Sequence, residues 1–145
     1  MNLSTRSRYG ARALVELAAH SGDGPVHLEA LAGSQDIPLR YLAAIVRDLK
    51  RAGLVRSVRG AHGGYLMGRK PAEVRLLDVV RCLEGSLATV PCVNDPGFCD
   101  RRDQCVTREV WAKVDDAIAE VLGSVTLQDL VDRRAEMKSP SAVQV

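Results

Sequence analysis

The chain has 145 residues, of which 46% are hydrophobic but only 3% aromatic, so its core must be mainly aliphatic. This length suits one domain, or one domain with an appendage, and no apolar run approaches the roughly 18 residues that a membrane span needs. The basic and apolar start could be mistaken for a signal peptide, but Arg12, Glu16 and His20 interrupt it. We therefore expect a cytoplasmic protein with no membrane partner, in which clustered cysteines bind metal or react more often than they form structural disulfides.

The net charge of +2 is distributed unevenly along the chain. Residues 1–70 contain 11 Lys and Arg against 5 Asp and Glu, whereas residues 71–145 contain 9 against 13. Between Pro38 and Lys70 there are eight basic residues and one acid, Asp48. Such a segment is either a solvated basic surface or an electrostatic footprint for a polyanion such as nucleic acid.

Three helices are expected in the first third of the chain. Apolar residues at helical spacing predict a first helix that ends near Ala19, where a segment with two glycines and a proline breaks the pattern. A short second helix is expected within 26–36. The third begins with Pro38 at its first position, where the missing N–H group costs nothing, and ends at Gly53. Its inward stripe consists of Leu42, Ile45, Val46 and Leu49.

The rest of the chain combines one hairpin with further helices. Two β-prone runs, 55–58 and 65–67, are separated by glycines that permit the positive φ of a hairpin tip. Further helices are expected at 74–85, 105–123 and 126–137. The last of these has Thr126 as its N-cap. The fold class is therefore mostly α with a small β-hairpin.

The second and third helices, joined by a tight turn, describe a helix-turn-helix, and the hairpin after them makes it a winged helix. Residues 38–44 would then enter the major groove of DNA, while Arg47, Lys50 and Arg51 would lie nearer the phosphates. Arg59 flanks the wing tip, from which an arginine can reach a narrow minor groove. A small helical domain with a cationic surface would show the same pattern, so pattern and charge alone leave DNA binding open.

Three of the four cysteines, Cys92, Cys99 and Cys105, lie in one polar segment whose prolines, glycine and charges exclude a core element. Their spacing is not the paired C-x-x-C of structural zinc sites, and thiolates suit zinc or iron–sulfur chemistry equally. A disulfide would use two of them and leave the third over. The fourth, Cys82, lies in the apolar stripe of the 74–85 helix, where a small buried side chain is its expected role. No nucleophile–base constellation or cofactor motif indicates an enzyme.

Nearly the whole chain resembles the winged-helix repressors typified by IscR and NsrR, regulators that carry iron–sulfur clusters. The resemblance covers residues 1 to about 136 and rests on SRYGARALVELA, the wing LVRSVRGAHGGYLMGR, LLDVVRCLEG and CVTREVWAKV. It implies a homodimer whose long C-terminal helices cross, with each recognition helix and wing on one half of a palindromic operator in double-stranded DNA. The implied division is a winged-helix DNA-binding domain at 1–85, a cysteine loop at 86–105, dimerisation helices at 106–136 and a tail at 137–145.

The resemblance also implies positions that contact DNA. Residues at or near the DNA in this family correspond to Ser4, Pro38, Arg40, Tyr41, Ala43 and Arg59. Position 43 is an acid in IscR, where it restricts base choice. Because this chain has Ala43, we expect it to accept a different operator.

For the cysteines, the family places its cluster on three loop residues with nearly the spacing found here, which favours an iron–sulfur cluster, 2Fe-2S rather than 4Fe-4S. The histidine ligand of IscR and the aspartate ligand of NsrR correspond to Arg108 and Arg8, which stay protonated and are not expected to ligate. The fourth ligand is therefore open among Glu109, Asp103, Asp100 and His62. The predicted function is a DNA-binding repressor that senses redox, nitric oxide or iron–sulfur status. The alternative is a relative without a cluster that responds through a thiol, zinc or a metabolite.

Overall fold

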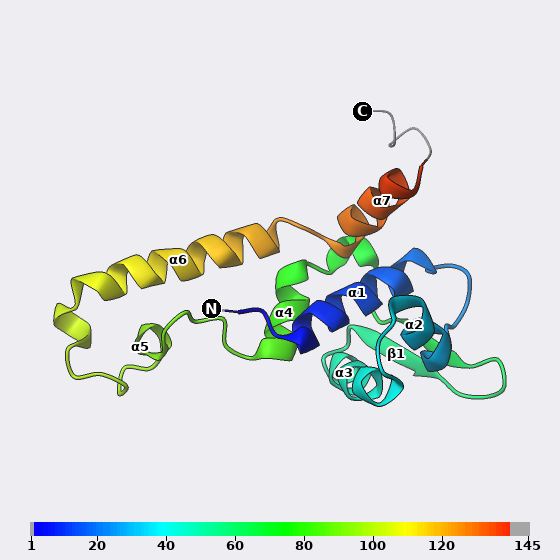
Figure 1. The fold of residues 1–145 in the computed structure, drawn as a ribbon, viewed down its shortest axis with the longest axis horizontal. Coiled ribbons are helices and arrows are strands. Elements are labelled where there is room, and N and C mark those ends of the chain that lie inside the picture. The colour runs from blue at the N-terminus through cyan, green and yellow to red at the C-terminus, as the bar shows by residue number, and fades with distance from the viewer. Residues whose placement is uncertain (1, 140–145) are drawn as a thin grey trace.

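A computed structural model describes residues 2–139, which form seven α-helices, two 3₁₀ turns and one two-stranded hairpin (Figure 1). The helices are α1 (Thr5–Ala19), α2 (Leu28–Gln35), α3 (Leu39–Arg51), α4 (Leu76–Glu84), α5 (Pro91–Asn94), α6 (Val106–Gly123) and α7 (Leu127–Lys138). The strands are β1 (Val55–Val58) and β2 (Gly64–Met67), and the 3₁₀ turns are η1 (Pro71–Glu73) and η2 (Arg102–Gln104). The prediction of a mostly helical fold with one small hairpin is confirmed.

The aliphatic core lies where α1, α3 and α4 pack together. The predicted inward stripe of α3 is buried throughout, with Leu42, Ile45 and Leu49 completely inaccessible to solvent. Gly10 permits the close approach of these helices, because a Cβ atom at this position would lie 2.2 Å from Leu83 Cδ1 of α4. The apolar stripe of α3 therefore faces the core, and the opposite face of this helix remains in solvent.

The turn between α2 and α3 is tight. Asp36 follows α2 in the left-handed conformation, with φ of 53°, and its N–H group caps the last carbonyls of that helix. Ile37 is buried, and Pro38 is the N-cap of α3, one position earlier than predicted. The two helices therefore form the predicted helix-turn-helix.

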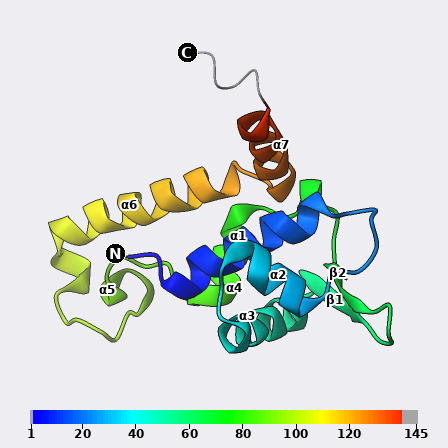
Figure 2. The same cartoon turned by 45° about the vertical axis from the view of Figure 1, so that its right-hand side comes forward.

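The hairpin follows α3 directly. Its strands are antiparallel, with Val55 opposite Met67 and Val58 opposite Gly64. Gly64 has φ of 142°, and a Cβ atom there would come within 2.5 Å of the carbonyl oxygen of Val26. Glycine at this position lets the hairpin pack against the segment before α2, and Figure 2 shows its turn extending away from the helices.

The C-terminal part consists of two unlike helices. Both views show α6 extending away from α2, α3 and the hairpin, with α5 beside its far end, and α7 returning to the side of α1 (Figures 1 and 2). Thr126 caps α7 as predicted, by accepting a hydrogen bond from the N–H group of Asp129. The predicted tail at 137–145 overlaps the end of α7, and residues 140–145 lie outside the described part of the chain. None of the helices in residues 2–139 combines the length and apolar character that crossing a bilayer requires.

Candidate DNA-binding surface and cysteine segment

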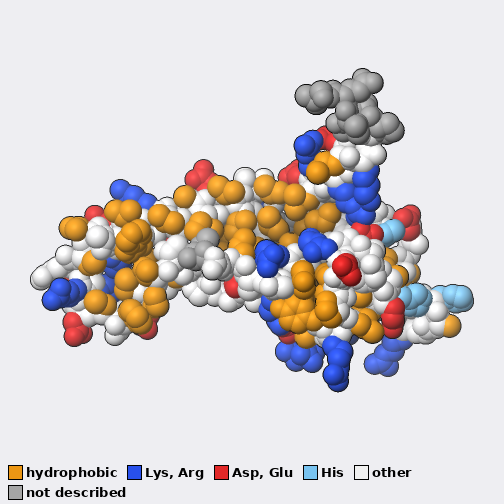
Figure 3. Space-filling view, in the orientation of Figure 1, with side chains coloured by type: hydrophobic (Ala, Val, Ile, Leu, Met, Phe, Trp, Pro, Cys, Tyr) orange, Lys and Arg blue, Asp and Glu red, His pale blue; other side chains and the backbone are white. Residues whose placement is uncertain are grey.

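The outward face of α3 is basic and open to solvent. Arg40, Arg47 and Lys50 are exposed and have no acidic partner within residues 2–139. The one acid of α3, Asp48, forms an ion pair with Arg6 of α1 and lies 3.5 Å from the guanidinium of Arg51. Figure 3 shows Lys and Arg side chains projecting from the edge of the molecule where α3 lies. This surface has the charge that a phosphate backbone requires.

The start of α3 presents the residues predicted to read bases. Pro38, Arg40 and Ala43 are exposed. Tyr41 is 36% exposed, and its ring packs edge-on against Tyr9 of α1, with the ring centres 5.7 Å apart. Tyr41 therefore also helps to hold α3 on α1, a packing contact that the sequence pattern did not predict.

Ser4 and Arg59, two further predicted DNA contacts, lie at the start of α1 and directly after β1. The hydroxyl of Ser4 caps α1 by accepting from the N–H group of Ser7 at 3.1 Å, while its own N–H group donates to Glu84 of α4 at 2.7 Å. Arg59 is exposed at the start of the hairpin turn, next to β1. The role of both residues in DNA contact stays a prediction.

The three predicted metal-ligating cysteines occupy one surface segment. Cys92 lies on α5, Cys99 is exposed in the following loop, and Cys105 is the N-cap of α6. Two arginines connect this segment. Arg102 donates to the carbonyl oxygen of Cys92 at 3.2 Å, and Arg108 donates to the carbonyl oxygen of Arg102 at 3.1 Å. Arg108 thus links the start of α6 to the 3₁₀ turn η2.

The pKa values of two of the thiols are shifted in opposite directions. The Cys105 sulfur lies 3.2 Å from the hydroxyl of Thr107, and this contact, with the N–H group of Arg108, lowers the pKa of Cys105. Burial instead raises the pKa of Cys82, whose sulfur lies 3.6 Å from the carbonyl oxygen of Asp48. The thiolate is the metal-binding form, so the lowered pKa of Cys105 agrees with its predicted role as a ligand, which stays a prediction.

The donor chemistry of the segment fits an iron–sulfur cluster, although its side chains are spread out. Within residues 2–139, no three Cys, His, Asp or Glu side chains are arranged as a metal site, and no disulfide joins the thiols. Among the candidate fourth ligands, His62 lies in the hairpin turn, at the opposite end of the molecule from the cysteine segment (Figures 1 and 2). Arg8 donates to the hydroxyl of Thr5 within α1. The identity of a fourth ligand stays open.

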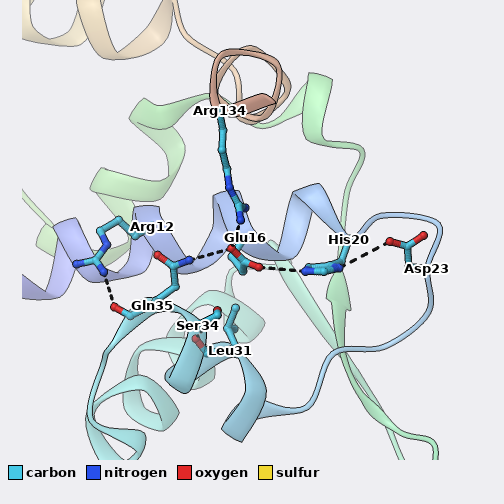
Figure 4. A network of polar contacts seen from close by, with 8 residues as sticks. All are labelled: Arg12, Glu16, His20, Asp23, Leu31, Ser34, Gln35 and Arg134. Atoms are coloured by element: carbon cyan, nitrogen blue, oxygen red, sulfur yellow. Dashed lines mark hydrogen bonds and ion pairs between the residues drawn. The ribbon is translucent and has the colours of Figure 1, made fainter. Parts of the chain in front are cut away.

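A buried carboxylate on α1, that of Glu16, joins this helix to α2 and α7 (Figure 4). Glu16 is 6% exposed and accepts hydrogen bonds from Gln35 of α2 at 2.8 Å and Arg134 of α7 at 2.6 Å. It also lies 3.0 Å from Nε2 of His20, and Arg12 donates to the carbonyl oxygen of Gln35. The sequence offered one signal for this network, an acid next to Leu17 on the apolar face of the first helix.

A sequence model of the Rrf2 family, described as iron-dependent transcriptional regulators, matches residues 3–133. The chain belongs to the Rrf2 family. It is 39% identical to the HTH-type transcriptional regulator CymR of Bacillus subtilis over 130 residues, which are 90% of this chain and 89% of CymR. It is 36% identical to the regulator IscR of Xenorhabdus nematophila over 131 residues, which are 90% of this chain and 79% of that IscR.

Solved structures of relatives have the same fold. The structure of T. potens IscR matches with a TM-score of 0.80 and 40% identity, covering 96% of this chain and 92% of that one. The structure of B. subtilis CymR, described as the global cysteine regulator, matches with a TM-score of 0.77 and 37% identity, covering 92% and 98%. The chain is therefore a winged-helix transcription regulator of a DNA-binding family and not an enzyme, as the sequence predicted.

Proposed function

We propose that the chain binds a palindromic operator as a homodimer, through α3 and the hairpin, and that the cysteine segment 86–105 controls this binding. The observation that carries the proposal is the basic face of α3, on which Arg40, Arg47 and Lys50 have no acidic partner in residues 2–139. Each phosphate contact releases counterions, so the affinity should fall steeply with salt. A repressor is the form that the resemblance favours.

The homodimer is supported by α6. This 18-residue helix has no buried residue, and Val106, Val110 and Val121 are 76%, 51% and 65% exposed. Its apolar side forms a groove of about 360 Å³ together with Leu3, lined by Val114, Ala117, Ile118, Val121 and Leu122. Apolar side chains that are exposed together on one helix face are typical of a protein–protein interface. A second copy of α6, crossing the first, would cover it.

The cysteine segment would hold an iron–sulfur cluster on Cys92, Cys99 and Cys105, with 2Fe-2S favoured over 4Fe-4S. The iron-dependent description of the family and the IscR relatives support this assignment. A bound cluster would supply a group that oxygen, nitric oxide or iron supply can alter. The protein itself connects the segment to both neighbours, because it follows α4 directly and the N–H group of Thr89 donates to Asp115 of α6 at 2.9 Å.

A cluster-free regulator that responds through a thiol, zinc or a metabolite is the second candidate. The arginines at positions 8 and 108 favour it, because both occupy ligand positions of cluster-binding relatives and both make other hydrogen bonds here. The similarity to CymR also favours it, since the solved structure of that protein is described as a global cysteine regulator.

Anaerobic purification separates the two candidates. We expect iron, acid-labile sulfide and visible absorption from thiolate–iron charge transfer in the wild type and in Cys82→Ala. None of the three should be found in Cys99→Ala. Wild-type protein with stoichiometric zinc and no sulfide, or with no metal, would decide for the second candidate. An operator selected from random duplexes then tests whether loss of the cluster changes DNA affinity. DNA affinity that is equal in both states would remove the sensing role.

A further inference from the structure

An apolar groove lies between α1 and α7, away from the cysteine segment and from the exposed face of α3. Its volume is about 550 Å³, which falls within the range of roughly 300–1,000 Å³ that small-molecule sites occupy. The apolar part of its lining comes from Ala11, Val15, Leu76, Leu130 and Met137. No residue of α6 contributes to it, so the groove is separate from the helix face that the proposed dimer would bury.

The rim of this groove is cationic. It carries Arg12, Arg133, Arg134 and Lys138, three of them on one side of α7. Their acidic partners are few in residues 2–139. Arg133 pairs with the exposed Glu136 at 2.9 Å, and Arg134 pairs with the buried Glu16, whereas Lys138 has no acidic partner. One donor atom of Arg134, Nη1, is buried without a hydrogen-bond partner in residues 2–139.

We propose that this groove binds a small amphipathic carboxylate. An aliphatic body of this ligand would cover the apolar lining, and its carboxylate would lie at Lys138 and the neighbouring arginines. The charge complementarity selects against cationic and zwitterionic ligands, because each positive group would face the same rim. Apolar contact supplies most of the affinity and the cations supply its direction.

The groove also reaches the turn that precedes α3. Gln35, the last residue of α2, lies in its rim. The carbonyl oxygen of Gln35 accepts from Arg12, and its side chain donates to Glu16, which also holds Arg134. A carboxylate that competes for Arg12 or Arg134 would therefore alter contacts that position the helix-turn-helix. This regulatory consequence rests on the proposed DNA binding, whereas the binding site itself does not.

Octanoate is the probe for the site, and octylammonium, with the same chain and opposite charge, is its control. Calorimetric titration without DNA should detect octanoate and not octylammonium. Lys138→Glu reverses one charge on the rim, and we expect the affinity for octanoate to fall about 10-fold, as for a reversed charge pair near a protein surface. Lys50→Glu makes the same charge change on α3, which does not line the groove, and should leave octanoate binding unchanged. Ala11→Leu fills the groove with a helix-compatible side chain and should abolish binding in a protein whose circular dichroism is unchanged.

Four results would overturn the assignment. Equal binding of octanoate and octylammonium, or equal effects of Lys138→Glu and Lys50→Glu, would show nonspecific association. Conversion of the dimer to monomers at saturating octanoate would show that a second copy covers the groove. Binding only to a chain that ends after Ser139 would assign the groove to residues 140–145. If octanoate binds as expected but leaves operator affinity unchanged, the proposed effect on the helix-turn-helix through Gln35 is wrong. If wild-type protein binds no operator at all, the proposed function fails independently of the site.

Discussion

Removal of the carboxylate of Glu16, on α1, should destabilise the fold far more than removal of the exposed carboxylate of Glu136, on α7. Glu16→Ala leaves the guanidinium of Arg134, 27% exposed, without the oxygen that now lies 2.6 Å away. It also leaves the amide of Gln35 without its acceptor. Breaking a buried ion pair by removing one partner costs about 3–5 kcal/mol, and the partial exposure of Arg134 reduces this to about 2–3 kcal/mol.

The matched control is Glu136→Ala. Glu136 pairs with Arg133, the neighbour of Arg134, at a similar distance of 2.9 Å, but both side chains are about two-thirds exposed, at 65% and 67%. Exposed pairs of this kind contribute less than about 1 kcal/mol. For a chain of this length, about 1 kcal/mol corresponds to about 2–4 °C in Tm. Glu16→Ala should therefore lower Tm by about 4–12 °C and Glu136→Ala by less than about 4 °C.

The contribution of Glu16 should also depend on pH. Burial alone raises the pKa of Glu16, but the hydrogen bond with His20 and the charge of Arg134 together place it below its ordinary value of 4.5. Because the folded-state pKa is the lower one, the stabilisation is complete above about pH 4.5 and is lost as the pH falls through the folded value. Urea unfolding should thus show a large difference between wild type and Glu16→Gln at pH 7 and a smaller one near pH 3. Equal Tm shifts for Glu16→Ala and Glu136→Ala would refute the reasoning.

Three further outcomes can be checked with single substitutions. Gly10→Ala should lower Tm, because its Cβ would lie 2.2 Å from a side-chain carbon of α4, whereas Gly33→Ala has open space around it and should raise Tm slightly; equal shifts would contradict this packing. Val114→Asp should yield monomers at micromolar concentration in light scattering, and a persistent dimer would exclude α6 as its interface. Arg59→Ala should reduce the slope of log affinity against log salt by about 0.9, whereas Arg40→Ala should change the preferred operator sequence; an equal loss on all sequences would contradict base reading by Arg40.

The fold could be predicted from local sequence because its main signals act over short distances. The stripe of α3 repeats at helical spacing, and its four members are the ones that the structure buries. The side chain of Thr126 marks the start of α7 and the N–H group of Gly85 the end of α4, each through a hydrogen bond to a residue three or four positions away. The predicted start of α3 is wrong by one residue, because Pro38 is the N-cap and not the first helical residue. Proline lacks an N–H group, so its presence near a helix start does not distinguish the two positions.

The contacts that shape the candidate site could not be predicted, because they join residues far apart in the chain. Nothing near Tyr41 in sequence indicates that its ring meets Tyr9. Arg108 could be recognised as a poor ligand, but not as the residue that holds the backbone of Arg102. Glu16 appeared only as an interruption of an apolar run, and its partner Arg134 lies more than a hundred residues later.

In the proposed dimer, the spacing of the two α3 helices would be set where α4 meets α6. The Cys82 sulfur on α4 contacts the backbone of Asp48 in α3, and Glu84 accepts from Ser4 at the start of α1, so α4 and the reading helix are connected. Helix α6 would hold the partner, and residues 86–105 lie between α4 and α6. The two α3 helices of the dimer must contact two half-sites that lie one helical turn of DNA apart, about 34 Å. A change in residues 86–105 would therefore alter the contacts with both half-sites at once. A duplex with one half-site tests this directly, because its affinity should hardly respond to the state of the cysteines, whereas the complete operator should respond strongly. An equal response of both duplexes would place the control within each α3 and not in the spacing between them.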